Sequence, residues 1–168
     1  ASVLAKTAVV RSMDWPQTNA FLQEVLVGKS EYEMLWVGDP QGNLKATTGQ
    51  SANIADRDYF RLVMETGKST VSDAVVSRFS NNLIVVVAAP ITDAAGKVVG
   101  IFGASVLLDQ LDAITVAAKM GSGYAYIVQR DGMAVTHPDR SLVMQPDKSF
   151  LKSSNTELKQ ATARMAAG

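Results

Sequence analysis

Two apolar runs joined by a four-residue turn constrain the fold of this chain more than any other feature. Residues 83–89 read LIVVVAA, a run that is too short for most helices and rich in valine, so we predict a central β-strand. The segment Asp93-Ala94-Ala95-Gly96 has turn chemistry, which makes residues 83–108 a β-hairpin. Pro90 cannot donate to a sheet ladder, so we expect the pairing to weaken at that residue.

The second strand of this hairpin contains two glycines, Gly100 and Gly103. A glycine inside a strand lowers its stability unless another group must come close to the backbone. Ala88 and Ala89 oppose these glycines with small side chains. We therefore expect a hollow over this part of the sheet, with room for a small-molecule ligand.

A short helix is predicted to precede the hairpin. Asp56 or Asp58 can cap its first turn, because a short carboxylate accepts hydrogen bonds from the unpaired amides there. Gly67 stands where a left-handed residue ends a helix. The apolar face of this helix consists of Phe60, Val63 and Met64.

Three further segments have strand character. Residues 69–78 mix apolar and polar side chains, as a strand with one wet face does. Residues 33–39 and 43–48 flank a turn at residues 39–42, and residues 49–55 read as a polar loop. Together with the hairpin, these segments predict a five-stranded antiparallel sheet, so the predicted fold class is α+β.

Helical patterns open and close the chain. Residues 1–27 predict a long N-terminal helix that Asp14-Trp15-Pro16 interrupts and Gly28 ends. Residues 109–120 predict a connecting helix, and two strand-like runs around residues 130–132 predict a second hairpin. Residues 155–167 predict a last helix, so the chain starts a second, partial copy of the same module.

Composition excludes several classes of function. Hydrophobic residues make up 47% of the chain and charged residues 19%, which is typical of a globular domain. Lys and Arg number 16, as do Asp and Glu, and this balance argues against a nucleic-acid partner. The chain has no Cys, and its one histidine, His137, is expected to hold a turn. These are too few ligands for a zinc or haem site, so we predict no metal and no cofactor.

Enzyme chemistry also finds no support in the sequence. One histidine does not support a Ser-His-Asp arrangement, and there is no Gly-rich phosphate loop or well-spaced carboxylate pair. No run reaches the roughly 18 apolar residues that span a bilayer, and no signal peptide opens the chain. We therefore predict a binding module rather than an enzyme.

Four ordered motifs carry a resemblance to a known family. They are Asp56-Arg57-x-Tyr59-Phe60, Val71-Ser72-Asp73, Ala88-Ala89-Pro90-Ile91 and Gly96-x-Val98-Val99-Gly100. Their order and spacing resemble the membrane-distal module of double Cache sensor domains. These are the PAS-like extracytoplasmic ligand-binding regions of bacterial chemoreceptors, sensor histidine kinases and diguanylate cyclases. The family's second module often carries His-Pro-Asp close to where His137-Pro138-Asp139 stand.

The resemblance implies a domain order. Residues 1–30 would form a stalk helix, residues 31–111 a membrane-distal PAS-like module, and residues 112–168 a connecting helix with an incomplete membrane-proximal module. The chain would be an ectodomain excised from between transmembrane helices, and it would form a homodimer through its N-terminal helix. The alternative is that the N-terminal apolar face only covers its own sheet.

The resemblance also implies a function. The chain would be the periplasmic sensor of an inner-membrane receptor, and we expect a methyl-accepting chemotaxis protein that binds a small polar metabolite. The alternatives are the sensor of a histidine kinase or diguanylate cyclase, or a dimerisation module without a ligand.

The expected ligand site centres on Arg57. In amino-acid-binding members of the family, a basic residue and an aromatic residue two positions later hold the ligand carboxylate, and these match Arg57 and Tyr59. A guanidinium can hold a carboxylate through two parallel hydrogen bonds. The alternative is a structural ion pair of Arg57 with Asp56 or Asp73.

The resemblance favours an organic acid over an α-amino acid. Asp73 matches one acceptor for the ligand amine, but the second acceptor falls at Ser105, where a neutral hydroxyl cannot balance an ammonium in a dry pocket. For Trp36 the alternative, a core or interface residue, is favoured because large aromatic side chains mostly fill space, and for Ser77 the alternative is a solvated loop end. The expected ligand-binding residues are Arg57, Tyr59, Phe60, Ser72, Asp73, Ser77, Ser105 and Trp36.

Overall fold

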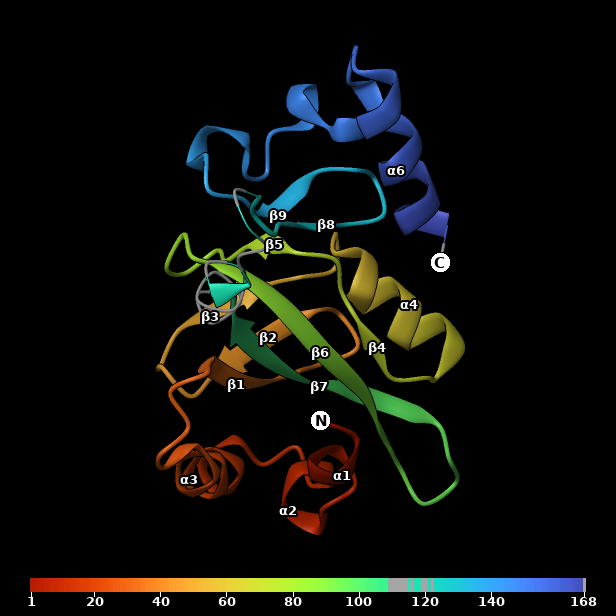
Figure 1. The fold of residues 1–168 in the computed structure, drawn as a ribbon. Helices are drawn as coiled ribbons and strands as arrows, with labels where there is room; N and C mark the ends of the chain where they lie inside the picture. The colour runs from red at the N-terminus through yellow and green to blue at the C-terminus, as the bar shows by residue number, and fades with distance from the viewer. Residues whose placement is uncertain (109–114, 116, 119–120, 122, 168) are drawn as a thin grey trace. The chain divides into compact units, whose positions relative to one another are not determined.

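The computed structural model describes residues 1–108, 115, 117–118, 121 and 123–167 (Figure 1). The chain divides into two compact units, Ala1–Leu107 and Leu108–Gly168, and each unit is described by itself. Most of the predicted connecting helix at residues 109–120 lies outside the described residues. No helix in the described ranges has both the length and the apolar run that a bilayer crossing requires.

The first unit is built on an antiparallel sheet of seven strands in the described residues, ordered β3-β2-β1-β7-β6-β4, with β5 also paired to β6. The strands are β1 (Tyr32–Gly38), β2 (Asn43–Ala46), β3 (Ser51–Asn53), β4 (Thr70–Val71), β5 (Val75–Val76), β6 (Leu83–Thr92) and β7 (Val98–Leu107). The predicted α+β class is confirmed, but the sheet has more strands than the five expected. Strand β3 lies in the predicted polar loop, and residues 69–78 form two short strands.

The predicted hairpin is the centre of the sheet. Strands β6 and β7 pair from Ile84↔Leu107 to Thr92↔Val98. At the turn, the Gly96 amide donates to the Asp93 carbonyl over 3.1 Å, and Gly96 has the left-handed φ of 82° that a glycine adopts without strain. Pro90 stays in register opposite Ile101, so the pairing of β6 with β7 does not break there, but the pairing of β6 with β4 ends at Ala88, before the proline. Strands β4 and β5 pair with β6 only at residues 83–88, so Pro90 has a strand on one side alone, where proline is tolerated.

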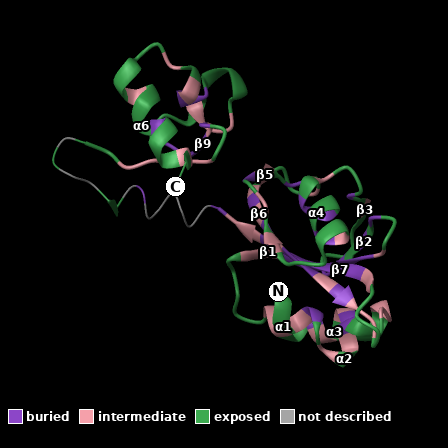
Figure 2. Cartoon of the chain, turned by 90° about the vertical axis from the view of Figure 1, so that its right-hand side faces the viewer, coloured by how far each residue is buried: buried purple, intermediate pink, exposed green. Residues whose placement is uncertain are grey.

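Helices cover both faces of this sheet (Figure 2). Alternating side chains of β1 divide between the faces, with Met34 and Trp36 in one core cluster and Leu35 and Val37 in the other. Helix α4 (Asp58–Thr66) packs on the first face. The second face is covered by α1 (Ser2–Ala5), α2 (Ala8–Arg11) and α3 (Trp15–Leu26).

The N-terminal helix, predicted with one interruption, is divided twice, into α1, α2 and α3. Thr7 caps α2, because its hydroxyl accepts the amide of Val10 over 3.4 Å. Met13 then takes a left-handed φ of 55°, which ends the helical path. The interruption expected at Asp14-Trp15-Pro16 is confirmed, since Asp14 caps α3 and Pro16 stands in its first turn. Leu22 is fully buried, so α3 covers its own sheet.

Helix α4 ends as predicted but begins differently. The Gly67 amide donates to the Val63 carbonyl over 2.9 Å in the left-handed conformation. Neither aspartate caps the first turn. The N-cap is Arg57, which makes no capping bond, while Asp56 pairs with Arg78 and Asp58 pairs with Arg61. The carboxylates are therefore engaged by arginines instead of by the helix amides.

The second unit contains the predicted second hairpin. Strand β8 (Ile127–Val128) pairs with β9 (Ala134–Thr136), and the Gly132 amide closes the turn on the Gln129 carbonyl over 2.8 Å. His137 is buried, and its Nδ1 accepts the Asp139 amide over 2.9 Å, which is the turn-holding role expected of it. The remaining helical elements are η1 (Arg140–Leu142), η2 (Pro146–Lys148), η3 (Phe150–Lys152) and α6 (Thr156–Ala167).

We predict that Gly67→Ala destabilises the first unit by about 1 kcal/mol, because an L-residue is strained at this left-handed φ. A Cβ at this position would meet only Val98 Cγ2 at 3.7 Å, an ordinary contact, so the cost comes from the backbone alone. The measurement is urea unfolding followed by circular dichroism. Gly67→Asn is the matched control and should cost less, since asparagine tolerates this conformation. Equal losses for both variants would contradict the backbone explanation.

Candidate functional site

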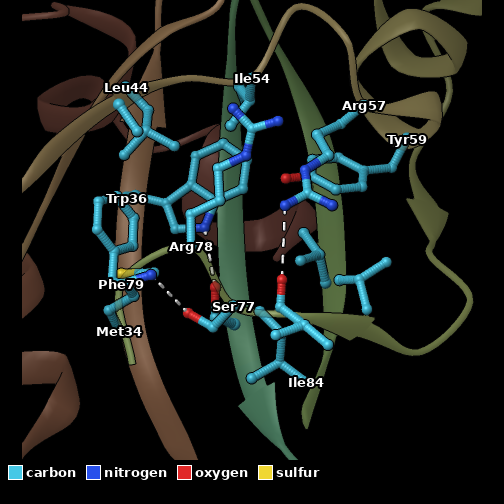
Figure 3. Close-up of a pocket in the computed structure, with 15 residues that line it drawn as sticks. Met34, Trp36, Leu44, Ile54, Arg57, Tyr59, Ser77, Arg78, Phe79 and Ile84 are labelled. Atoms are coloured by element: carbon cyan, nitrogen blue, oxygen red, sulfur yellow. Dashed lines mark hydrogen bonds between the residues drawn. The ribbon is translucent and has the colours of Figure 1, made fainter. Parts of the chain in front are cut away.

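A pocket lies between the sheet and the start of α4 in the first unit (Figure 3). Strands β1, β6 and β7 supply its floor, and the segments on either side of it are residues 52–59 and residues 75–79. The 15 lining residues are Met34, Trp36, Leu44, Ala52, Ile54, Arg57, Tyr59, Val75, Val76, Ser77, Arg78, Phe79, Ile84, Val86 and Ser105.

The pocket has little free space. Its cavity volume is about 20 Å³, which is enough for roughly one water molecule. Sites that hold small molecules usually offer about 300–1,000 Å³. In this conformation the protein's own side chains fill the space, so a ligand can enter only if the walls move.

The hollow predicted over Gly100 and Gly103 is wrong, because other side chains occupy it. A Cβ built on Gly103 would lie 2.0 Å from Cζ2 of Trp36, so the indole rests directly on the glycine backbone. A Cβ on Gly100 would lie 2.8 Å from the Met13 methyl group on the other face. The glycines therefore make room for protein side chains, and the pocket lies beside Trp36.

Arg57 is the cation at this pocket without a carboxylate partner among the described residues. Its Nη2 donates to the Val76 carbonyl over 3.5 Å, a long and weak hydrogen bond. The structural ion pair considered for Arg57 is not formed, since Asp56 pairs with Arg78 and Asp73 has no ion pair in the described part of the chain. The half-buried Arg57 guanidinium is available to an anion.

Arg78 is a second guanidinium at the pocket, and it is held by its neighbours. Its Nη1 donates to the Asn53 carbonyl over 2.7 Å, and its Nη2 pairs with Asp56. Desolvation alone would raise the pKa of Asp56, but the hydrogen bond and charge of Arg78 keep that pKa below its ordinary value. Asp56 therefore stays ionised and forms an ion pair with Arg78, although Asp56 itself does not line the pocket.

Two hydroxyl groups add neutral donors. Burial raises the pKa of Tyr59, so its phenol stays protonated, and it makes no hydrogen bond to the described residues. The Tyr59 ring lies 6.2 Å from the ring of Trp36. The Trp36 indole N–H donates to Oγ of the buried Ser105 over 3.2 Å, and the Ser105 hydroxyl donates no hydrogen bond to the described residues.

Ser77 lines the pocket, but its hydroxyl is already engaged. It donates to Glu33 Oε2 over 2.9 Å and accepts the Phe79 amide over 3.3 Å. Ser80 donates to the other oxygen of Glu33. Ser77 therefore acts mainly in holding the segment that covers the pocket.

Three of the expected site residues do not line this pocket. Phe60 is buried in the core cluster beneath α4. The Ser72 hydroxyl accepts the Val86 amide over 2.9 Å and so stabilises the β4–β6 pairing. Asp73 is exposed and lies in the connection between β4 and β5. The structure thus brings together Arg57, Tyr59, Ser77, Ser105 and Trp36 out of the expected set.

Phe79 is a pocket residue that the sequence reasoning missed. It is an aromatic residue inside the otherwise polar run Ser77-Arg78-Phe79-Ser80-Asn81-Asn82. That contrast was the available signal, because an apolar ring in a polar turn usually packs inward. Phe79 packs against the same core cluster as Met34 and Trp36.

The chemistry of the pocket favours an anion. The described residues that line it include two guanidinium groups and no Asp or Glu. The guanidinium groups and the Tyr59 hydroxyl lie at the same side of the pocket (Figure 3), whereas its floor is mostly aliphatic. A small molecule with a carboxylate at one end and an apolar body matches this arrangement.

A larger cavity of about 520 Å³ lies near the N-terminal helices and strands β2 and β3. It contains none of the expected site residues, and its lining is Met13, Trp15, Thr18, Val37, Asp39, Asn43, Leu44, Lys45, Ser51 and Ala52. Within the described residues, no cluster of three or more His, Cys, Asp or Glu side chains could hold a metal ion.

We predict that Gly103→Ala destabilises the first unit by about 1–3 kcal/mol, because the added methyl group collides with the Trp36 indole. The double variant Trp36→Phe/Gly103→Ala should lose less than the sum of the two single variants, since phenylalanine lacks the outer indole ring. Urea unfolding of all four proteins measures this coupling. Strict additivity would show that the indole does not require glycine.

A family model described as the Cache domain matches residues 3–167 of this chain. Sporulation kinase D of Bacillus subtilis is 24% identical over 131 residues, and the methyl-accepting chemotaxis protein PscA of Pseudomonas syringae is 26% identical over 136 residues. These alignments cover 76% and 80% of this chain, but 26% and 20% of the two relatives. The chain thus spans about a quarter or less of their length.

A solved structure has the same fold. The ligand-binding domain of the Pseudomonas fluorescens chemoreceptor CtaA in complex with L-isoleucine superposes with a TM-score of 0.70 at 21% identity. The superposition covers 90% of this chain and 63% of that domain. The resemblance predicted from the sequence motifs is confirmed, and the chain belongs to the Cache domain family.

Proposed function

We propose that this chain is the extracytoplasmic sensor of a bacterial transmembrane receptor, and that its first unit binds a small organic acid. The observation that carries the proposal is the composition of the pocket. Arg57, Arg78, Tyr59 and Ser105 supply donors around an aliphatic floor, and no described lining residue supplies a carboxylate. A site of this kind stabilises an anionic ligand, whereas a cationic ligand would find no carboxylate among the described lining residues.

The kind of ligand follows from the same charge balance. The related domain named above was solved with L-isoleucine, a zwitterion whose ammonium requires an acceptor. Asp73, the acceptor expected in this chain, is exposed and outside the pocket lining. An ammonium buried beside two guanidinium groups without a carboxylate would be unfavourable by several kcal/mol. We infer a carboxylate ligand without a neighbouring amine.

The whole receptor is part of the proposal. The relatives are a chemotaxis protein and a sporulation kinase, and we propose a chemotaxis receptor first, with a histidine kinase or diguanylate cyclase as the alternative. Membrane anchoring, a periplasmic location and a homodimer formed through the N-terminal helices belong to the same proposal. Ligand binding would shift the receptor between two arrangements by its difference in affinity for them.

One observation favours a second candidate, a dimerisation module without a ligand. The cavity volume of about 20 Å³ is too small for an organic acid in this conformation. The two candidates differ in a measurable way, because only a sensor gains stability from a carboxylate.

We predict that Arg57→Ala removes the stabilisation that a carboxylate provides. The experiment records thermal unfolding of the 168-residue chain with a panel of organic acids at saturating concentration. Loss of a charge-assisted hydrogen-bond pair of about 1.5–3 kcal/mol should weaken binding roughly 10- to 100-fold.

The control for this prediction is Arg61→Ala. Arg61 lies on the same helix, is exposed, pairs with Asp58 and does not line the pocket, so its removal should leave the stabilisation intact. An acid that stabilises the Arg57→Ala protein as much as the wild type would show that the site is elsewhere. If no acid stabilises the wild-type chain, the module without a ligand is favoured.

A further inference from the structure

The segment that closes the pocket is a compact turn between β5 and β6, residues 77–82. The Ser77 amide donates to the Asn82 carbonyl over 2.8 Å, and the Asn81 amide donates to the Ser77 carbonyl over 3.2 Å. Asn81 takes the left-handed conformation with a φ of 61°, which asparagine tolerates better than most residues. The turn therefore has a defined shape that its own hydrogen bonds hold.

Phe79 is the part of this turn that enters the pocket. Arg78, Ser80, Asn81 and Asn82 are exposed, whereas Phe79 is half-buried and packs against the core cluster. Figure 3 shows its ring at the pocket wall. With Phe79 in place, the free volume is about 20 Å³. The Phe79 ring is thus one of the side chains that bound this small volume.

Two polar clamps hold the turn against the pocket. On one side, Arg78 binds the Asn53 carbonyl and the Asp56 carboxylate, which both precede α4. On the other side, Ser77 and Ser80 donate to the two oxygens of Glu33 on β1. The Asp56 clamp is exposed to solvent, so breaking it costs little, because a released carboxylate is hydrated at once.

We propose that Phe79 is a specificity-determining residue and that Arg78 changes partner when the ligand binds; this inference rests on the proposed function. The ligand's carboxylate takes the place of Asp56 on Arg78, and its apolar body takes the place of the Phe79 ring. The ligand class is therefore a monocarboxylate with an aliphatic or aromatic body of about the size of a phenyl group.

The exchange is physically balanced. Arg78 gives up one carboxylate and gains another, so its own guanidinium is not left unpaired by the exchange. The aliphatic floor loses contact with the Phe79 ring and gains contact with the ligand body, so no empty cavity remains. An acid too short to fill that space gains the ion pair but leaves a void, whereas a longer acid gains both contacts.

The test is isothermal titration of acetate, butyrate and hexanoate into the 168-residue chain and two variants. In Phe79→Ala the space is already open, so each methylene buried there should tighten binding about fourfold. Hexanoate affinity should therefore rise about tenfold or more over wild type, while acetate stays within about threefold. In Asp56→Asn, Arg78 is released, and all three acids should bind more tightly by one common factor.

A control variant and a fluorescence measurement accompany the titration. Leu62→Ala removes an exposed leucine of α4 that does not line the pocket, and it should leave all three affinities unchanged. Trp36 fluorescence reports a rearrangement of the pocket lining, which includes Phe79, without any change to the turn. In a Trp15→Phe chain, Trp36 is the single remaining tryptophan, and hexanoate should shift its emission as the ring leaves.

The outcomes separate the two proposals. If the acids bind the wild-type chain and lose affinity in Arg57→Ala, but Phe79→Ala changes all three affinities equally, then Phe79 does not determine specificity and the organic-acid sensor stands. Hexanoate binding without a change in Trp36 emission overturns the displacement of Phe79 in the same way. If none of the acids binds the wild-type chain or either variant, both proposals fall together.

Discussion

The contact between the Trp36 indole and the backbone of Gly103 fixes the geometry of the pocket. With any side chain at position 103, the indole could not lie flat on β7. Its position there brings the indole N–H to Ser105 and its ring within 6.2 Å of the Tyr59 ring. Tyr59 belongs to the first turn of α4, so the same contact helps to set where the helix begins and where Arg57 stands.

The sequence predicted those elements that local chemistry determines. The β6–β7 hairpin, the left-handed end of α4 and the break at Asp14 follow from turn and capping preferences that act over a few residues. Strand β3 was missed, because Ser51–Asn53 is polar and owes its strand geometry to pairing with β2. The break between α1 and α2, where Thr7 caps the second helix, was missed, because the apolar stripe of residues 3–10 gives no sign of it.

The pocket was harder to derive, because it depends on which side chains meet across the sheet. The motif spacing located Arg57 and Tyr59 at the lining, and Ser105 followed from the position of the family's second amine-binding aspartate. Asp73 and Ser72 lie in the irregular connection between β4 and β5, where no alternation indicates which side chain faces inward. The partner of each charge was equally hidden: Asp56 binds Arg78, 22 residues away in the chain, and not its neighbour Arg57.

The strands next to the pocket differ in how many residue pairs join them to the sheet. The floor belongs to the long ladder that runs from Ile84↔Leu107 to Thr92↔Val98, whereas β4 and β5 join β6 through only the pairs at Thr70, Val71, Val75 and Val76. Amide protons of the short strands are therefore expected to exchange with solvent through local opening, long before those of the ladder. Local opening at β4 and β5 therefore leaves the central hairpin folded.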